Sequence, residues 1–500
     1  MSEKVFDYDV VIIGSGAGGG TIAKELSPLC QKGLKVALLE WGGSFEKKHN
    51  TRNEIEMATR YYFEHGGLQT KQNDLTLAFA KAVGGTTTVY TGTSLKASAS
   101  VLNRWAVPGI DLDDLNPRYE KYIQENGVHL NSPEEINENN QLFYKACKKL
   151  GYKVEQFPVN TRGCQGLGTC NLGCAVHAKQ GTAAVQIPAA KKNGVDVFPF
   201  CKVEKIKDHD VLVTVSAPCF DQEPSSLAPG VYCFRASKIV LAAGALFSPI
   251  LLEKSFGNRK WPALGRYFTC HPALILTGEH QRPITNFVGH PKSYYCDEFT
   301  ESHRFVLETC MYFPFTLAKN ICGFGEELDD LMKHYAHLQM ILVLAIDEAR
   351  AENRVRLGRN GMPKVFYHFS ESTIQSFVKA IQESARIFFA AGVRRVHAPA
   401  MDQFFIFPFE QKKIDSLITR EHFKLGKISI TAAHLMGGCR MGEDPRVSVT
   451  NSWGRVHGLN HVFVADASLF PKAVEINPYL TIMALADRVA EGIKKELEGK

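Results

Sequence analysis

The chain lacks the features of a membrane-spanning or secreted protein. It contains no run of about 18 or more apolar residues, so the sequence predicts no transmembrane helix. Its first residues, Met1 to Asp9, hold neither an apolar signal core nor a pair of arginines. We therefore expect a soluble protein of the cytoplasm.

A large excess of charge of either sign is also missing. The 58 Lys and Arg residues stand against 52 Asp and Glu residues, which leaves a formal charge of +6, and the charges are scattered along the chain. Binding of nucleic acid depends on clustered basic residues, so we expect no nucleic-acid partner. The sequence contains no internal repeat or low-complexity tract. With 500 residues, of which 45% are hydrophobic, it can form two or three domains with buried cores.

The first ordered segment predicts a turn that binds a dinucleotide. A short apolar strand at 9–13 leads into the glycine-rich stretch 14–20, which is followed by a helix at 21–26 and a strand at 36–39. In such a turn Gly14 permits the tight bend, Gly16 lets the backbone approach a pyrophosphate, and Gly19 lets the helix pack closely on the strand.

An acidic residue stands where this motif needs one. Glu40 ends the second strand, 21 residues after Gly19, and a carboxylate there accepts hydrogen bonds from both hydroxyls of an adenosine ribose. It also disfavours a 2′-phosphate. The phosphates would lie on the helix N-terminus, where free N–H groups favour an anion. By itself this turn fits NAD and FAD equally well.

The remaining elements predict two domains that differ in the arrangement of their strands and helices. Strand-like runs near Val203, at 211–215 and at 238–242 predict a small antiparallel meander. Other elements are predicted from their apolar periodicity, namely helices at 139–150, 370–390 and 481–497 and strands at 338–345 and 462–465. The last strand and helix resemble the elements of the first domain, so we assign them to it.

We therefore predict an α/β fold in which a discontinuous, Rossmann-like dinucleotide domain is joined to an α+β substrate domain, an antiparallel sheet covered by helices. The dinucleotide domain is assigned to residues 1–45, 75–100, 165–265 and 430–500. The substrate domain is assigned to residues 46–74, 101–164 and 266–429.

Four further stretches resemble the glucose–methanol–choline (GMC) family of FAD-dependent oxidoreductases. Residues 81–90, Lys-Ala-Val-Gly-Gly-Thr-Thr-Thr-Val-Tyr, are similar to the family's Gly-Gly-Ser-Ser loop beside the flavin, although Tyr90 stands where many members have Asn. Residues 244–249 resemble its second signature. The most specific stretches are 434–442, His-Leu-Met-Gly-Gly-Cys-Arg-Met-Gly, and 477–486, which begins with Asn-Pro. The resemblance covers nearly the whole chain.

The resemblance implies that an FAD lies between the two domains. Gly84, Gly85 and Thr86 would then lie beside the flavin, and Val203 would meet the adenine through its backbone. Asp466, at the end of the last strand, could hold ribityl or pyrophosphate-side hydroxyls. Family members that attach FAD through a histidine carry it in the Gly84 loop, which has none here, so we expect non-covalent FAD.

Alcohol oxidation needs a base, because an alkoxide releases hydride far more readily than a neutral alcohol. Histidine has a pKa suited to this task, and an amide can donate to the developing oxyanion without taking up charge. The resemblance places His434 and Asn477 in these two roles, as in the His–Asn cholesterol and choline oxidases. By spacing alone, a histidine before a Gly-Gly turn and an Asn-Pro pair at a helix start are more often structural.

Three of the 13 cysteines, Cys164, Cys170 and Cys174, lie close together in a Gly/Asn-rich segment. An odd number of cysteines in a long chain suits reduced thiols better than disulfides. The trio resembles the 3Fe-4S cluster loop in the flavin subunits of bacterial fructose and glucose dehydrogenases, except that Ala175 replaces the usual proline. A structural zinc shared with His177 and simple packed thiols are the other two interpretations.

The leading hypothesis is FAD-dependent oxidation of a small-molecule alcohol to a carbonyl, with His434 as general base and Asn477 orienting the substrate oxygen. The electron acceptor is external, and oxygen, a quinone or an acceptor protein all fit the sequence. The composition of residues 294–345 favours a bulky apolar alcohol, although core packing explains it equally well. A redox-neutral lyase, as in the hydroxynitrile lyases of the family, and a non-catalytic flavoprotein subunit stay open.

Overall fold

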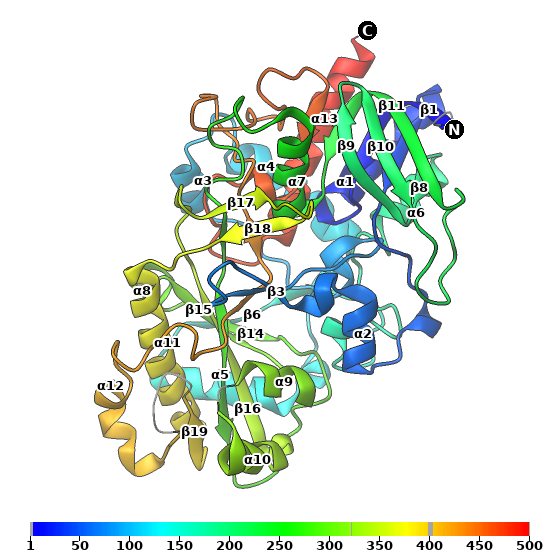
Figure 1. Cartoon of the computed structure of the whole chain (residues 1–500). Helices are drawn as coiled ribbons and strands as arrows, with labels where there is room; N and C mark the ends of the chain where they lie inside the picture. Colours follow the sequence, from blue (N-terminus) through cyan, green and yellow to red (C-terminus); the bar gives the residue numbers. More distant parts are fainter. Residues whose placement is uncertain (1–3, 322, 399–403, 500) are drawn as a thin grey trace.

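Two β-sheets organise the chain and lie at opposite ends of the molecule (Figure 1). The structure is a computed structural model that describes residues 4–321, 323–398 and 404–499. The seven-stranded first sheet lies at the end that holds β1 and α13, the first and last elements of the chain. The ten-stranded second sheet forms the other end.

The first sheet has the strand order β8-β2-β1-β11-β10-β9, with β23 beside β11. Its five mutually parallel strands are β1 (Lys4–Ile13), β2 (Val36–Leu39), β8 (Asp196–Phe198), β11 (Gly230–Leu241) and β23 (Val462–Val464). Helices α1 (Ala17–Leu26), α4 (Leu112–Glu125), α6 (Gln186–Lys192) and α13 (Tyr479–Glu498) contribute buried residues to its core. Every residue of β2 is buried, as expected for a parallel strand in the middle of a sheet.

The predicted meander is confirmed for part of its length. Strand β9 (Cys201–Lys207) pairs antiparallel with β10 (Asp210–Val215), which pairs antiparallel with the first half of β11. The predicted third run, 238–242, is wrong as a separate meander strand, because 238–241 is the second half of β11 and pairs in parallel with β1 and β23. A strand of 12 residues is long enough to serve both arrangements.

The second sheet is antiparallel in its centre, where β13, β16, β15 and β14 lie side by side. Its strands are β3 (Leu68–Gln69), β4 (Thr76–Leu77), β6 (Val154–Gln156), β13 (Ala273–Glu279), β14 (Tyr294–Cys296), β15 (Phe305–Thr309), β16 (Leu338–Ala345), β19 (Arg395–His397), β20 (Phe405–Ile406) and β21 (Thr431–Ala432). Strands β4 and β21 therefore lie in the second sheet, although the predicted boundaries place both segments in the first domain. The domain boundaries otherwise stay a prediction.

Alternate side chains of β16 serve two different cores. Ile341, Val343 and Ala345 pack in the cluster that holds helix α11 (Glu371–Ala390), next to α5 (Glu138–Leu150). Leu342 and Leu344 belong to the opposite cluster. Because side chains alternate along a strand, one face of this sheet packs against α11 and α5, and the other packs in part against α9 (Pro314–Asn320) and α10 (Gly325–Lys333) and in part lines a cavity.

Shorter helices and strand pairs complete the fold. The helices are α2 (Glu54–Tyr61), α3 (Ala99–Trp105), α7 (Gly244–Phe256), α8 (Thr300–His303), α9 (Pro314–Asn320), α10 (Gly325–Lys333) and α12 (Ile414–Leu417). The strand pairs are β5 (Val128–Leu130) with β7 (Pro158–Asn160), β12 (Thr269–Cys270) with β22 (Leu435–Met436), and β17 (Arg354–Leu357) with β18 (Pro363–Phe366). None of the described helices combines the length and apolarity needed to cross a membrane.

We expect Gly18→Ala to destabilise the fold, because a Cβ at position 18 would lie 1.7 Å from the carbonyl oxygen of Ala465 at the end of β23. Helix α1 would have to move off the sheet, at a cost of about 3 kcal/mol. Gly16→Ala is the matched control, since a Cβ there meets only Gly85 Cα at 3.8 Å. Thermal unfolding of both variants, after removal of any bound ligand, measures the difference. Equal midpoints would contradict this close approach.

Candidate active site

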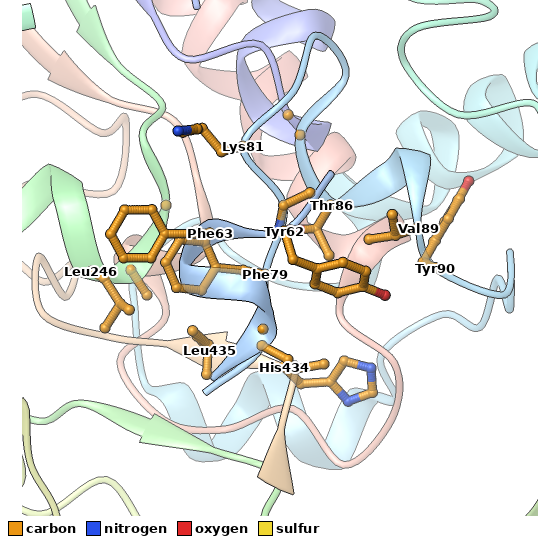
Figure 2. Close-up of a pocket in the computed structure, with 18 of the residues that line it drawn as sticks. Tyr62, Phe63, Phe79, Lys81, Thr86, Val89, Tyr90, Leu246, His434 and Leu435 are labelled. Atoms are coloured by element: carbon orange, nitrogen blue, oxygen red, sulfur yellow. The ribbon is translucent and has the colours of Figure 1, made fainter. Parts of the chain in front are cut away.

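A deep cavity lies between the two sheets, and residues from both line it (Figure 2). Of the residues singled out from the sequence, those on the wall are Gly14, Gly16, Glu40, Gly85, Thr86, Val203, His434, Asp466 and Asn477. In Figure 2 the loop with Thr86 and Val89 lies above the cavity and His434 lies below it. Tertiary structure therefore gathers residues from the two ends and the middle of the chain.

The glycine turn has the geometry that its sequence requires. Gly14 has a φ of +97°, which only glycine adopts readily. A Cβ on Gly19 would lie 1.9 Å from the carbonyl oxygen of Gly14, so this glycine keeps the helix against the turn. Gly16 leaves the open backbone surface that a pyrophosphate needs.

Glu40 and Ser15 connect this turn to the Gly84 loop. The buried Glu40 carboxylate accepts from the Ser15 N–H (3.0 Å) and hydroxyl (2.7 Å) and from the Gly42 N–H (2.8 Å). Ser15 Oγ in turn accepts from the Gly84 N–H at 2.9 Å. Burial raises the pKa of Glu40, and these hydrogen bonds oppose the rise. The carboxylate keeps lone pairs for a further donor such as a ribose hydroxyl.

Helices α1, α7 and α13 begin at the cavity. The first residues of α1, α7 and α13, namely Ala17, Gly244 and Tyr479, all lie on its wall. Helix N-termini present free N–H groups and a partial positive charge. The cavity thus favours an anionic ligand such as a pyrophosphate.

Asp466 joins the end of β23 to the start of α7. Its carboxylate accepts from the Gly244 N–H (2.8 Å), the Ser248 hydroxyl (2.5 Å) and the Ser468 N–H (2.8 Å). These bonds give it a structural part that the sequence did not indicate. Its predicted contact with cofactor hydroxyls stays a prediction.

Val203 lies at an irregularity of β9. It pairs with Val213 and Lys205 pairs with Leu212, so Glu204 is one extra residue opposite β10. Such a bulge leaves backbone groups outside the ladder. Because Val203 also lines the cavity, its backbone is available to a ligand, as the predicted adenine contact requires.

A second histidine orients His434. The Nε2–H of His271 donates to the carbonyl oxygen of Val474 at 2.5 Å, because a carbonyl can only accept. A neutral His271 is therefore an acceptor at Nδ1, which lies 3.0 Å from Nδ1 of His434. His434 must donate from its own Nδ1, and its lone pair is left on Nε2. His271 was not among the residues predicted from the sequence, because it precedes His434 by 163 residues and has no motif of its own.

Both imidazoles are held neutral by their surroundings. Burial lowers the pKa of His271 to about 4. Burial, with smaller contributions from His271 and Lys292, holds the pKa of His434 well below its usual range. A neutral imidazole is the form that can accept a proton.

Asn477 completes the pair expected from the sequence. Its Nδ2 lies 3.4 Å from Nε2 of His434, and its buried Oδ1 has no hydrogen-bond partner among the described residues. The preceding Glu475 forms ion pairs with Arg104 and Arg304, which fixes the segment before α13. A long contact and an unpaired buried amide oxygen are what a polar ligand would complete.

The second sheet contributes apolar side chains to the cavity wall, and a buried ion pair lies beside them. Ala273, Ile275 and Leu344 supply apolar surface, and Lys292 lines the same cavity while it pairs with the buried Glu308. A buried ion pair is costly unless both charges are satisfied. This pair is the second feature that the sequence analysis missed, because neither residue belongs to a motif.

Family models match most of the chain. The model described as GMC oxidoreductase matches with its N-terminal part over residues 9–273 and with its C-terminal part over residues 349–486. This chain belongs to the GMC oxidoreductase family. It is therefore an oxidoreductase of the family that its motifs resemble.

Individual relatives agree over almost the full length. A GMC-type oxidoreductase of Mycobacterium tuberculosis described as uncharacterised is 29% identical over 98% of this chain and 76% of its own length. The long-chain-alcohol oxidase FAO4B of Arabidopsis thaliana is 26% identical over 98% of this chain and 68% of its own.

Solved structures confirm the predicted fold class, including the Rossmann-like domain. Pyridoxine 4-oxidase from Mesorbium loti superposes with a TM-score of 0.73 at 18% identity, over 97% of this chain and 99% of that one. An FAD-dependent oxidoreductase from Chaetomium thermophilum superposes with a TM-score of 0.70 at 16% identity, over 98% and 100%.

The cysteine trio of this GMC oxidoreductase lies on a loop beside the cavity. Burial raises the pKa of Cys170 to about 12, and Sγ of Cys174 accepts from the Ala178 N–H at 3.1 Å. The three sulfurs are not among the groups of described residues whose ligand atoms all lie within 4.8 Å, whereas a tetrahedral zinc holds its sulfurs closer than that. The wider cluster stays a prediction, which iron and acid-labile sulfide analysis would test.

Lys179 fastens the same loop to the Gly84 loop. Its buried ammonium donates to the carbonyl oxygens of Cys170 (2.5 Å), Thr88 (2.5 Å) and Tyr90 (3.1 Å). Tyr90, the departure from the family pattern, packs edge-on against Tyr479, and Asn160 Nδ2 donates to its hydroxyl. Tyr90 therefore anchors the Gly84 loop to neighbouring segments.

If His271 fixes the tautomer of His434, the hydrogen-bond acceptor at position 271 should matter more than the ring itself. We expect His271→Leu to lower kcat for substrate oxidation by about tenfold or more, because His434 can then place its proton on Nε2. His271→Asn, whose amide oxygen can accept from His434, should retain most of kcat. Steady-state kinetics measure both variants, and a smaller loss in His271→Leu than in His271→Asn would contradict this role.

Proposed function

We propose that this GMC oxidoreductase oxidises the CH–OH group of a small-molecule alcohol to a carbonyl, with FAD bound non-covalently. The hydrogen-bonded series Val474, His271, His434 is the observation that supports this most strongly. It leaves a neutral imidazole with its lone pair toward Asn477 on the wall of the cavity. A proton acceptor and an amide donor meet there, as alcohol oxidation requires.

The residues of the cavity fit FAD. Glu40 suits the adenosine ribose, the N-termini of α1 and α7 suit the pyrophosphate, and the bulge at Val203 suits the adenine. Gly85 and Thr86 line the cavity, and Thr86 lies across it from His434 (Figure 2). When bound, the flavin supplies the hydride acceptor of the reaction.

The chain's own residues can remove the hydroxyl proton of the alcohol. Nε2 of His434 takes the hydroxyl proton as the carbinol C–H bond breaks, while Nδ1–H stays bonded to His271. The Asn477 amide N–H groups donate to the oxygen as it gains negative charge. The hydrogen bond from His271 to the Val474 carbonyl oxygen fixes the tautomer of His271, and that in turn fixes the tautomer of His434. His271 does not itself need to ionise.

An apolar alcohol fits the far wall of the cavity. Ala273, Ile275, Leu342 and Leu344 line it, so a hydrocarbon portion of the substrate would be removed from water. The likeness to a long-chain-alcohol oxidase supports the same substrate class. The electrons then pass to an external acceptor.

Anaerobic mixing with candidate alcohols tests the proposal, since oxidation must bleach the flavin. We expect His434→Ala to slow flavin reduction by about 10²–10⁴-fold, because it removes the base. Asn477→Ala should slow it by about 10²-fold through the lost oxyanion donor. His65→Ala is a matched control, because His65 also lines the cavity but, among the described residues, hydrogen-bonds to Thr59 and not to His434 or Asn477.

Equal reduction rates in all three variants would contradict these roles. Turnover of a substrate without any bleaching would instead favour the lyase. Absence of turnover with every alcohol would favour the non-catalytic subunit.

The pH dependence should reveal the lowered pKa of His434. A protonated imidazole cannot act as base, so kcat/KM should fall as the pH drops through this pKa, which lies below the usual 6.5. A plateau is therefore expected at neutral pH. Joint replacement of the ion pair, Lys292→Met with Glu308→Gln, removes the nearby ammonium and should move the acid limb to higher pH. Profiles of kcat/KM from about pH 5 to 9 measure both effects, and an unmoved limb would exclude Lys292 as a contributor.

A further inference from the structure

A group of potential metal ligands lies on the first sheet, away from the cavity. Asp208, His209 and His461 each bring one ligand atom to within 4.8 Å of the other two. None of the three lines the cavity described above. The group therefore has no part in the chemistry assigned to His434.

Two separate segments form this group. Lys207 pairs with Asp210 across β9 and β10, so Asp208 and His209 are the turn of that hairpin. Asp208 has a φ of +54°, which aspartate tolerates better than most residues. His461 comes directly before β23, some 250 positions later.

The histidine rings are already oriented. Nδ1 of His209 donates to the carbonyl oxygen of Ala236 at 2.7 Å, which leaves the lone pair on Nε2. Such a backbone partner commonly orients a metal-binding histidine. Nε2 of His461 donates to the carbonyl oxygen of Asp208 at 3.0 Å and lies 3.8 Å from Oδ1 of Asp208, so an ion at this nitrogen would replace that hydrogen bond. The two rings lie with centroids 4.3 Å apart.

Ligand type and nearby charge favour a transition metal. Two imidazoles and one carboxylate suit Zn²⁺, whereas Ca²⁺ and Mg²⁺ prefer oxygen ligands alone. Two of the nearby cations are paired, Arg235 with Asp210 and Lys238 with Glu496. His461 is sheltered, with 13% of its side chain exposed, whereas Asp208 is 80% exposed and free to move toward an ion.

We propose that Asp208, His209 and His461 bind a divalent transition-metal ion of the Zn²⁺ type, with water completing its coordination. The ion would clip the β9–β10 hairpin to the start of β23. Asp466 follows the opposite end of β23, so the ion stabilises the sheet from the end away from the cavity and does not contact the reacting groups. This site is independent of the proposed alcohol oxidation.

Calorimetric titration of the flavin-containing full chain with ZnCl₂ tests the site. The titration uses a Cys219→Ser background, so that this exposed thiol does not compete. We expect one equivalent to bind, and expect His209→Asn and His461→Gln each to weaken its binding by about tenfold or more. His129→Asn is the control, because His129 is an exposed histidine whose Nδ1 donates to the carbonyl oxygen of Gly127 and which lies outside the proposed site.

Thermal unfolding provides a second measurement. Zn²⁺ should raise the unfolding midpoint of the background protein and of His129→Asn, but not that of His461→Gln. Asp208→Asn, at an exposed turn position, repeats the test should His461→Gln fail to fold. Unchanged Zn²⁺ affinity in His209→Asn and Asp208→Asn, or no Zn²⁺ binding by the background protein, would overturn the proposal.

Discussion

Direct backbone contact between the glycine turn and the ends of two parallel strands sets the positions of the helix N-termini on the cavity wall. A Cβ at Gly14 would meet the carbonyl oxygen of Ala242 after β11, and one at Gly18 would meet that of Ala465 after β23. Helix α1 therefore lies closer to the sheet than any side chain would permit. This approach brings the N-termini of α1, α7 and α13 to one cavity, which is what makes it suitable for an anion.

At the reacting end of the cavity, the orientation of the His434 lone pair matters as much as the distance between His434 and Asn477. His434 and Asn477 come from separate segments, and either ring nitrogen of His434 could in principle carry the proton. The hydrogen bond from His271 to Val474 removes that ambiguity. It places the His271 proton on Nε2, so Nδ1 of His271 accepts and Nδ1 of His434 must donate. A base with a fixed lone pair needs no tautomer exchange before it accepts a proton.

Strand β23 separates two functions within one sheet. At its carboxyl end Asp466 joins α7 to the cavity wall. At its amino end His461 faces the tip of the β9–β10 hairpin. Ligands of open α/β sheets lie at the carboxyl ends of the strands, so a metal ion at the amino end would act on the stability of the sheet and leave the redox chemistry to the cavity.

Local rules explain what the sequence by itself determined. The glycine turn, Glu40 and the long helices at 139–150 and 370–390 follow from spacing and periodicity within single segments, and the motifs around His434 and Asn477 indicated the family. Contacts between distant segments were decided only by tertiary structure. His271 meets His434 because β12 pairs with β22, Lys292, just before β14, meets Glu308 on the neighbouring strand β15, and β11 joins a meander to a parallel sheet. No local pattern encodes such pairings, since each depends on which strands are adjacent in space and on their register.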